Sequence, residues 1–227
     1  MSTPRRLIVG ITGATGIVYG VRLLELLREA GIETHLVVSR AADLTRLHEL
    51  DLSGKELRAL ATVHYPITDI GAPIASGSFR TMGMIVAPCS ARTLAEIASG
   101  VAGSLLTRAA DVVLKERRRL VLLFRETPLH AGHIRNMLAA TEAGAVVMPP
   151  VPAFYGRPSS IDDLVTATVC RALDLFDIDP GRLRRWGEDI PTRPHRGTGD
   201  RHSPRRHAKP LTHQQCERQC ASQTNLS

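Results

Sequence analysis

The stretch that decides the fold is Leu120-Val121-Leu122-Leu123-Phe124, which runs directly into Arg125-Glu126-Thr127-Pro128-Leu129-His130. Five apolar residues in a row predict a strand buried on both faces, as in a parallel sheet covered by helices. A helical pattern follows over 131–143, so the unit reads strand, loop, helix. A charged pair at the end of a buried strand is poor core material. It suits a site that holds an anion and moves a proton.

The same alternation continues along the chain. Further strands are predicted over 7–11, 34–38, 84–87 and 145–148, and helices over 15–30, 91–99, 104–118 and 161–176, with a helical pattern broken at Ser53-Gly54 over 40–62. Gly31 is predicted to end the helix before it, and Pro88 to end the strand before it. The fold class expected is a single α/β domain with a Rossmann-like or flavodoxin-like, doubly wound, mainly parallel sheet and helices on both faces.

Length and charge narrow the class of protein. The chain has 227 residues, of which 43% are hydrophobic, enough for one well-packed domain that we place at residues 1–190. Most of the net charge of +7 lies in residues 191–227, which hold six arginines and one lysine against two acids. Because that segment has almost no large apolar side chains, we expect a basic, disordered tail. The rest of the chain carries only +2, which disfavours a nucleic-acid-binding protein.

The sequence also bears on the cellular location of the protein, on disulfides and on metal binding. No apolar run approaches the roughly 20 residues that span a bilayer, and no signal-peptide pattern opens the chain, so we expect a cytoplasmic protein with no membrane partner. Four cysteines in this length do not make a disulfide framework. The histidines of the tail are irregularly spaced, and no metal site is expected.

Residues suited to ligand binding follow the predicted strands. They are Gly13–Thr15 after the first strand, Ser39 after the second, Cys89–Thr93 after the third, Arg125-Glu126 after the fourth and Tyr155 after the fifth. In parallel α/β sheets, ligands bind outside the carboxyl ends of the strands. This coincidence predicts a ligand site from the pattern alone.

The first of these segments is the glycine turn Gly10-x-x-Gly13-x-x-Gly16 between a strand and a helix. Such a turn can direct backbone N–H groups and a helix start at a phosphate, and the alternative is a tight turn without ligand. The spacing differs from G-x-G-x-x-G, and the second strand ends in Ser39-Arg40 instead of the acid that binds a ribose. The sequence therefore favours a mononucleotide over NAD.

Residue types indicate candidate roles for the polar residues that follow the other strands. Ser90 is suited to cap a helix or to bind a ligand, and both interpretations stay open. Arg125 is a candidate partner for a phosphate or a flavin carbonyl. Glu126 is the only acid predicted in these loops, so it is the candidate general acid or base. Cys89 has no basic neighbour in the sequence and is interpreted as a buried small residue.

Four segments together resemble the flavin prenyltransferase family, of the UbiX type, whose members are also described as subunits of aromatic or phenolic acid decarboxylases. They are RETPLH at 125–130, PPVPAFY at 149–155, the glycine turn at 10–16 and the stretch 106–117. The resemblance covers about 6–186. It implies a metal-independent enzyme that transfers a dimethylallyl group from dimethylallyl monophosphate to N5 and C6 of reduced FMN. The product, prenylated FMN, would serve a UbiD-type decarboxylase, and the enzyme would be a homo-oligomer, a dodecamer in the family.

The resemblance also implies site residues. By this resemblance, the residues that bind FMN are Gly13, Ala14, Thr15, Ser39, Ser90, Ala91, Arg92, Thr93 and Arg125. The residues that contact the substrate phosphate would be Ser76, Arg108, Lys115, Glu126, Tyr155 and Arg171. The catalytic residues would be Glu126, Tyr155, Lys115 and Arg171. Lys115 would act across the interface between two copies of the chain, although by itself it reads as part of a solvated charged run. Thr15 and Ser104 stand where the family usually has Ser and Asn.

Three alternatives differ in class. An accessory subunit of an aromatic acid decarboxylase would bind flavin without consuming dimethylallyl phosphate. A flavin-dependent cysteine decarboxylase of the same fold would carry a catalytic histidine on the first helix, where this chain has Ile17-Val18-Tyr19-Gly20. A nucleic-acid-binding protein would depend on the basic tail.

Overall fold

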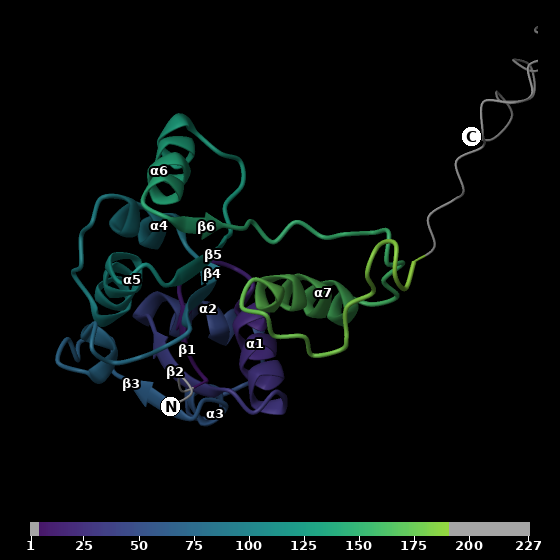
Figure 1. Ribbon diagram of the computed structural model, residues 1–227, viewed down its shortest axis with the longest axis horizontal. Coiled ribbons are helices and arrows are strands. Elements are labelled where there is room, and N and C mark those ends of the chain that lie inside the picture. Colours follow the sequence, from purple (N-terminus) through teal and green to yellow (C-terminus); the bar gives the residue numbers. More distant parts are fainter. Residues whose placement is uncertain (1–4, 191–227) are drawn as a thin grey trace, which may run out of the picture. The chain divides into compact units, whose positions relative to one another are not determined.

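The computed structural model describes residues 5–190 (Figure 1). The predicted tail, 191–227, lies outside the described residues, so the tail and the domain boundary stay predictions. The elements in chain order are β1 (Arg6–Ile11), α1 (Ile17–Glu29), β2 (Glu33–Val38), α2 (Arg40–Glu49), α3 (Gly54–Ala59), β3 (Val63–Tyr65), the 3-10 turn η1 (Pro73–Ala75), β4 (Gly83–Cys89), α4 (Ala91–Ala98), α5 (Leu105–Lys115), β5 (Arg119–Phe124), α6 (Ala131–Glu142), β6 (Ala145–Val147) and α7 (Ile161–Asp174).

The strands form one parallel sheet of six, in the order β3-β2-β1-β4-β5-β6. This confirms the predicted fold class, with a sheet that is wholly parallel among the described residues. The strand order reverses between β1 and β4, because the chain runs outward to β3 and then returns to the far side of β1. In folds of this kind, ligands bind at the carboxyl edge of the sheet beside this switch point, next to the loops that follow β1 and β4.

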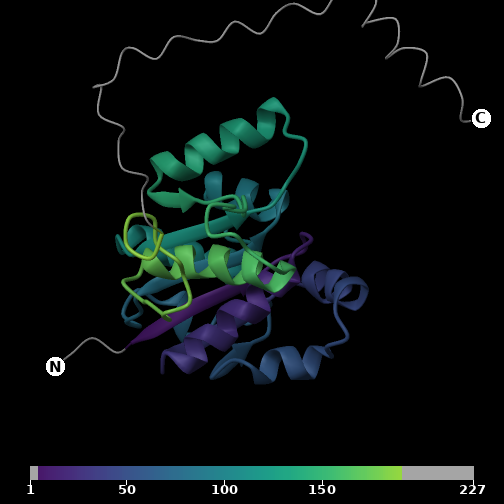
Figure 2. The same ribbon diagram turned by 90° about the vertical axis from the view of Figure 1, so that its right-hand side faces the viewer.

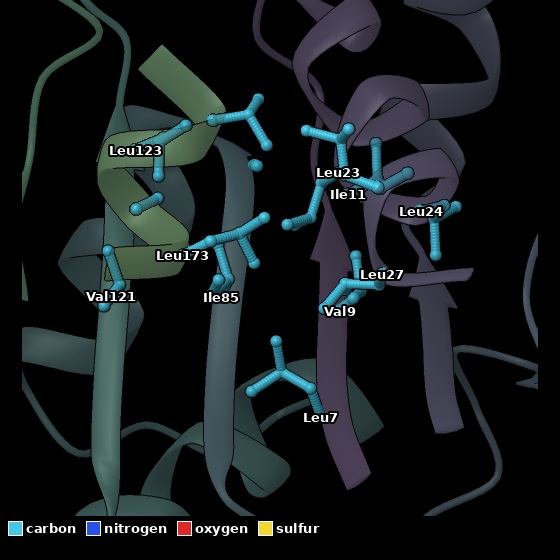
Figure 3. Packing of buried hydrophobic residues seen from close by; sticks show 14 of the residues in the cluster. Leu7, Val9, Ile11, Leu23, Leu24, Leu27, Ile85, Val121, Leu123 and Leu173 are labelled. Atoms are coloured by element: carbon cyan, nitrogen blue, oxygen red, sulfur yellow. The ribbon is translucent and has the colours of Figure 1, made fainter. Parts of the chain in front are cut away.

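Helices cover both faces of the sheet (Figures 1 and 2). Leu7, Val9 and Ile11 of β1 pack under α1 and α7, together with Leu173 of α7 (Figure 3). Ile8 points to the opposite face, where α4, α5 and α6 lie. This alternation follows from the two-residue repeat of a strand. Each fully buried Leu or Val side chain stabilises the fold by roughly 1.5–3 kcal/mol, so the two layers fix the strand ends that carry the site.

Three local predictions are corrected. Pro88 does not end its strand, because β4 continues to Cys89 across a register shift between Val86 and Cys89, which tolerates a residue without an N–H. The edge strand β3 was not predicted, since three residues are too short for a periodic signal. The helix predicted over 104–118 ends at Lys115, and Arg117 takes a left-handed conformation with φ of 55°.

Within residues 5–190, none of the helices combines the length and the apolar character that a bilayer span requires.

Candidate functional site

Hydrogen bonds join the ends of three neighbouring strands. The backbone N–H and the hydroxyl of Thr12 both donate to the carbonyl of Pro88, at 3.2 and 2.8 Å, and the same hydroxyl accepts from Ser90 N at 2.8 Å. Arg125 N donates to the carbonyl of Cys89 at 3.0 Å. The loops after β1, β4 and β5 are thus fixed to one another, and the polar residues predicted in these loops lie at one edge of the sheet. Thr12, fully buried, was missed, because a threonine at a strand end carries no distinctive signal.

Two helices begin at this edge with serine caps. Ser39 Oγ accepts from Ala42 N at 3.1 Å at the start of α2, and Ser90 Oγ accepts from Thr93 N at 3.3 Å at the start of α4. The Ser90 hydroxyl donates to Thr93 Oγ1 at 3.1 Å. A side chain at Gly13 would overlap the Ala41 methyl, so the glycine turn packs directly against α2. Both helices begin at this edge, and the positive dipole end of a helix start favours an anion bound next to it.

The start of α1 is occupied by a carboxylate from the same chain. Glu49, at the end of α2, accepts from Gly16 N at 2.9 Å and from Ile17 N at 2.8 Å. The glycine turn was expected to direct the start of this helix at a phosphate, whereas in the structure the two amides donate to Glu49. Glu49 also brings a second acid to this edge, from α2 and not from the loops in which Glu126 was the only acid predicted. No local pattern predicts that the end of α2 returns to the start of α1.

Arg125 supplies the positive charge at this edge. It is half-buried, and within residues 5–190 its guanidinium forms no hydrogen bond or ion pair with another side chain. Burial raises the pKa of Tyr19 above its ordinary value, and the nearby Arg125 guanidinium lowers it in part. Glu126 accepts from the N–H of Thr127 at 3.0 Å and is also half-buried. A half-buried arginine with free donors fits a flavin carbonyl or phosphate, and the free hydroxyl hydrogen of Ser39 fits the same ligand.

The remaining predicted FMN residues differ in how they face this edge. Thr15 is exposed and Ala14 is half-buried in the glycine turn, while Thr93 is buried and Ala91 is half-buried on α4. The guanidinium of Arg92, with its side chain 87% exposed, pairs with Glu96 at 2.8 Å along the helix. Its guanidinium is therefore engaged along the exposed face of α4.

Tyr155 and Arg171 lie together in a second region. Both line a cavity of about 380 Å³ between α7 and the segments 151–158 and 182–184. The Tyr155 ring meets the ring of Trp186 edge to face, with centroids 5.7 Å apart, and Trp186 is 60% exposed. Arg171 pairs with Asp174 at 2.5 Å. Tyr155 and Arg171 thus share one cavity, and the joint role that the resemblance gave them stays a prediction.

Lys115 lies at the opposite edge of the sheet from Arg125. Three residues join the end of α5 to the start of β5, so Lys115 sits near the amino end of that strand, whereas Arg125 follows its carboxyl end. Six residues of strand separate these ends by about 20 Å. Lys115 Nζ pairs with Glu116 at 2.5 Å, and a side chain at Gly77 would meet both groups, which places Ser76 beside them. Arg108, two turns earlier on α5, pairs with Asp111 at 2.6 Å. A single chain therefore does not bring Lys115 to the carboxyl edge.

The chain is similar to known flavoproteins over most of its length. A family model described as "Flavoprotein" matches residues 1–173. The flavin prenyltransferase UbiX of Thauera aromatica is 54% identical over 181 residues, which cover 80% of this chain and 93% of the relative.

Two solved structures are also similar. One is described as AnUbiX (PadA1) in complex with FMN and dimethylallyl pyrophosphate, with a TM-score of 0.80, 54% identity, and coverage of 81% of this chain and 97% of the other. The second is described as a dodecameric FMN-dependent Ubix-like decarboxylase from Escherichia coli O157:H7, with a TM-score of 0.78, 51% identity, and coverage of 80% and 98%. The chain belongs to the flavoprotein family and, within it, to the UbiX-type flavin prenyltransferases.

Proposed function

We propose that this protein transfers a dimethylallyl group from dimethylallyl monophosphate to N5 and C6 of reduced FMN, giving prenylated FMN. The observation that carries the proposal is the meeting of Arg125, Glu126 and the serine caps at the switch point of the sheet, in a chain of this family. The relative crystallised with FMN and dimethylallyl pyrophosphate supports both ligand classes.

FMN is held at the carboxyl edge by the glycine turn 13–15, Ser39, the segment 90–93 and Arg125. The capped starts of α2 and α4 offer hydroxyls and backbone N–H groups to its phosphate, since the start of α1 is closed by Glu49. Arg125 binds a flavin carbonyl through its free guanidinium donors. When bound in reduced form, FMN supplies the nucleophilic nitrogen and ring carbon that accept the dimethylallyl group.

The protein's own task is to release phosphate from the dimethylallyl carbon. As the carbon–oxygen bond breaks, negative charge grows on the departing phosphate, and fixed cations and hydrogen-bond donors stabilise that charge. Lys115, Arg108 and Arg171 supply cations, while Tyr155 and Ser76 supply hydroxyl donors. Glu126 delivers a proton to the leaving phosphate or receives one released as the new bonds form.

Assembly is part of the proposal. Because Lys115 and Ser76 lie at the amino edge, they reach the flavin of a neighbouring chain and not their own. The relative described as dodecameric supports a homo-oligomer, and we propose the dodecamer for this chain as well. Prenylated FMN would pass to a UbiD-type decarboxylase, and the cytoplasmic location expected from the sequence stays a prediction.

The deciding experiment mixes the purified full-length protein, without oxygen, with reduced FMN and dimethylallyl monophosphate. The expected result is a flavin heavier by one dimethylallyl group, together with released inorganic phosphate. A flavin-carrying accessory protein would retain FMN but return it with unchanged mass and release no phosphate. Tight NAD binding without flavin retention would contradict the proposed cofactor site.

A further inference from the structure

The loop 76–79 is held to the end of α5 by one arginine. Arg118 donates from Nη1 to the carbonyl of Phe79 and from Nη2 to the carbonyl of Gly77, both at 2.7 Å. Its side chain is 19% exposed, so these bonds are largely shielded from water. The rigid fork of a guanidinium matches two carbonyls of one loop, which a lysine ammonium cannot do with the same geometry.

The same loop packs on the ion pair formed by Lys115 and Glu116. A side chain at Gly77 would overlap Glu116 Oε1 and lie 2.7 Å from Lys115 Nζ, so only glycine fits there without displacing the pair. Lys115 holds the pKa of the Glu116 carboxyl below its usual value, with a smaller contribution from Arg118. The position of the loop and the position of the Lys115 ammonium are therefore set together.

Phe79 anchors the other end of the loop to the sheet. The Arg6 guanidinium lies 4.9 Å from the centre of the Phe79 ring, and the His35 ring meets Phe79 edge to face at 5.1 Å. With the ring fixed on that side and Arg118 bound to the backbone, little freedom is left to residues 76–78. Within this short stretch the hydroxyls of Ser76 and Ser78 lie 2.9 Å apart.

We propose that Arg118 is a positioning residue for the phosphate of dimethylallyl monophosphate. It holds the Ser76 and Ser78 hydroxyls beside the Lys115 ammonium, so that each chain carries a preassembled phosphate subsite at its amino edge. Its own guanidinium is engaged by two carbonyls, and it acts through the loop instead of binding the phosphate. This inference rests on the proposed function, in which a neighbouring chain uses that subsite.

The neighbouring Arg117 offers a matched control. It is exposed, carries the same charge one residue earlier, and within residues 5–190 forms no hydrogen bond or ion pair through its side chain. Arg118→Met and Arg117→Met therefore remove the same charge from nearly the same place, and only the first removes the contacts to the loop and the 3.9 Å ion pair with Glu116. Arg118→Lys keeps the positive charge but cannot form the paired hydrogen bonds that the guanidinium donates to the two carbonyls.

The test combines steady-state kinetics with hydrogen exchange of the full-length protein. In Arg118→Met we expect the KM for dimethylallyl monophosphate to rise about ten- to a hundredfold, the range for lost hydrogen bonds to a charged group. FMN affinity should stay within about twofold of the unaltered protein, since Arg118 contacts the loop of the phosphate subsite and none of the residues assigned to FMN. Amides of residues 76–80 should exchange faster in Arg118→Met, less so in Arg118→Lys, and at the unaltered rate in Arg117→Met.

Two outcomes overturn the inference and can be told apart. If the unaltered protein makes no prenylated flavin, the proposed function fails and the subsite with it. If the unaltered protein turns over and Arg118→Met shows an unchanged KM and unchanged loop exchange, the inference alone fails. If Arg118→Met does not fold, the comparison of Arg118→Lys with Arg117→Met decides the question, again by the KM for dimethylallyl monophosphate and by the amide exchange of residues 76–80.

Discussion

The carboxylate of Glu49 accepts a hydrogen bond from the backbone N–H of Gly16 at 2.9 Å, so the end of α2 closes the start of α1. The same carboxylate accepts from the next amide, and a negative charge at a helix start is favourable. The contact fixes the carboxyl-terminal end of the glycine turn, because Gly16 is the last residue of that turn. It also brings a second acid to the edge where Glu126 lies.

Replacing Glu49 should therefore weaken the fold near the glycine turn. For Glu49→Ala we expect the free energy of unfolding to fall by about 1.5–3 kcal/mol, the range for hydrogen bonds to a charged group, and for Glu49→Gln by less. Urea denaturation followed by far-UV circular dichroism measures the change. Asp51→Asn, at an exposed position two residues later, is the control and should have little effect. Equal midpoints for Glu49→Ala and the control would refute this role.

Glu126→Gln tests the acid or base. Glutamine keeps the size of the side chain and its acceptance of the Thr127 amide but cannot exchange a proton. We expect FMN and dimethylallyl monophosphate to bind normally and kcat to fall by about 10²–10⁴-fold, the usual contribution of a general acid or base. Single-turnover assays with pre-bound ligands measure this. Near-normal turnover would reduce Glu126 to a structural partner of the loop.

Tyr155→Phe tests the phenol in the cavity along α7. The ring and its edge-to-face contact with Trp186 are retained, and only the hydroxyl is lost. We expect binding of dimethylallyl monophosphate to weaken by about 1.5–3 kcal/mol, the cost of one hydrogen bond to a charged group. Calorimetric titration provides the measurement. An unaltered affinity would mean that the hydroxyl does not reach the phosphate.

The buried His35 predicts a pH dependence of stability. Burial lowers the pKa of His35 below its ordinary value of 6.5, and the hydrogen bond to Glu33 opposes this shift only in part. The neutral ring is therefore favoured in the folded state, and its contribution to stability is complete above pH 6.5 and lost as pH falls through the lower folded pKa. His35→Gln should lose less stability than the unaltered protein between pH 7 and 5, measured by urea titration. Parallel pH profiles would contradict this.

Removal of residues 191–227 should leave the flavin domain functional. Those residues carry almost no large apolar side chains, so they cannot add much to a core. We expect the truncated chain to keep its thermal midpoint and FMN affinity, as measured by differential scanning fluorimetry and flavin fluorescence. A truncated chain that is insoluble or binds no FMN would show that the tail is needed.

Some features were determined by the sequence alone. Apolar runs such as 120–124 report burial on both faces, and polar residues directly after them, such as Arg125 and Ser39, must then lie at the carboxyl edge of a parallel sheet. The caps at Ser39 and Ser90 also follow from local chemistry, because a serine before a helical pattern binds the amides of its own first turn. These inferences hold because each depends on residues close together in the chain.

Only the tertiary structure decided which distant groups meet. The contact of Glu49 with Gly16 spans 33 residues, and that of Arg118 with Gly77 spans 41. Sequence periodicity reports which face of an element is buried, but not which element packs against that face. The place of Lys115 follows from the antiparallel course of α5 against β5, which puts the two ends of one helix at opposite edges of the sheet. Its distance from Arg125 was therefore set by packing of whole elements and not by any local pattern.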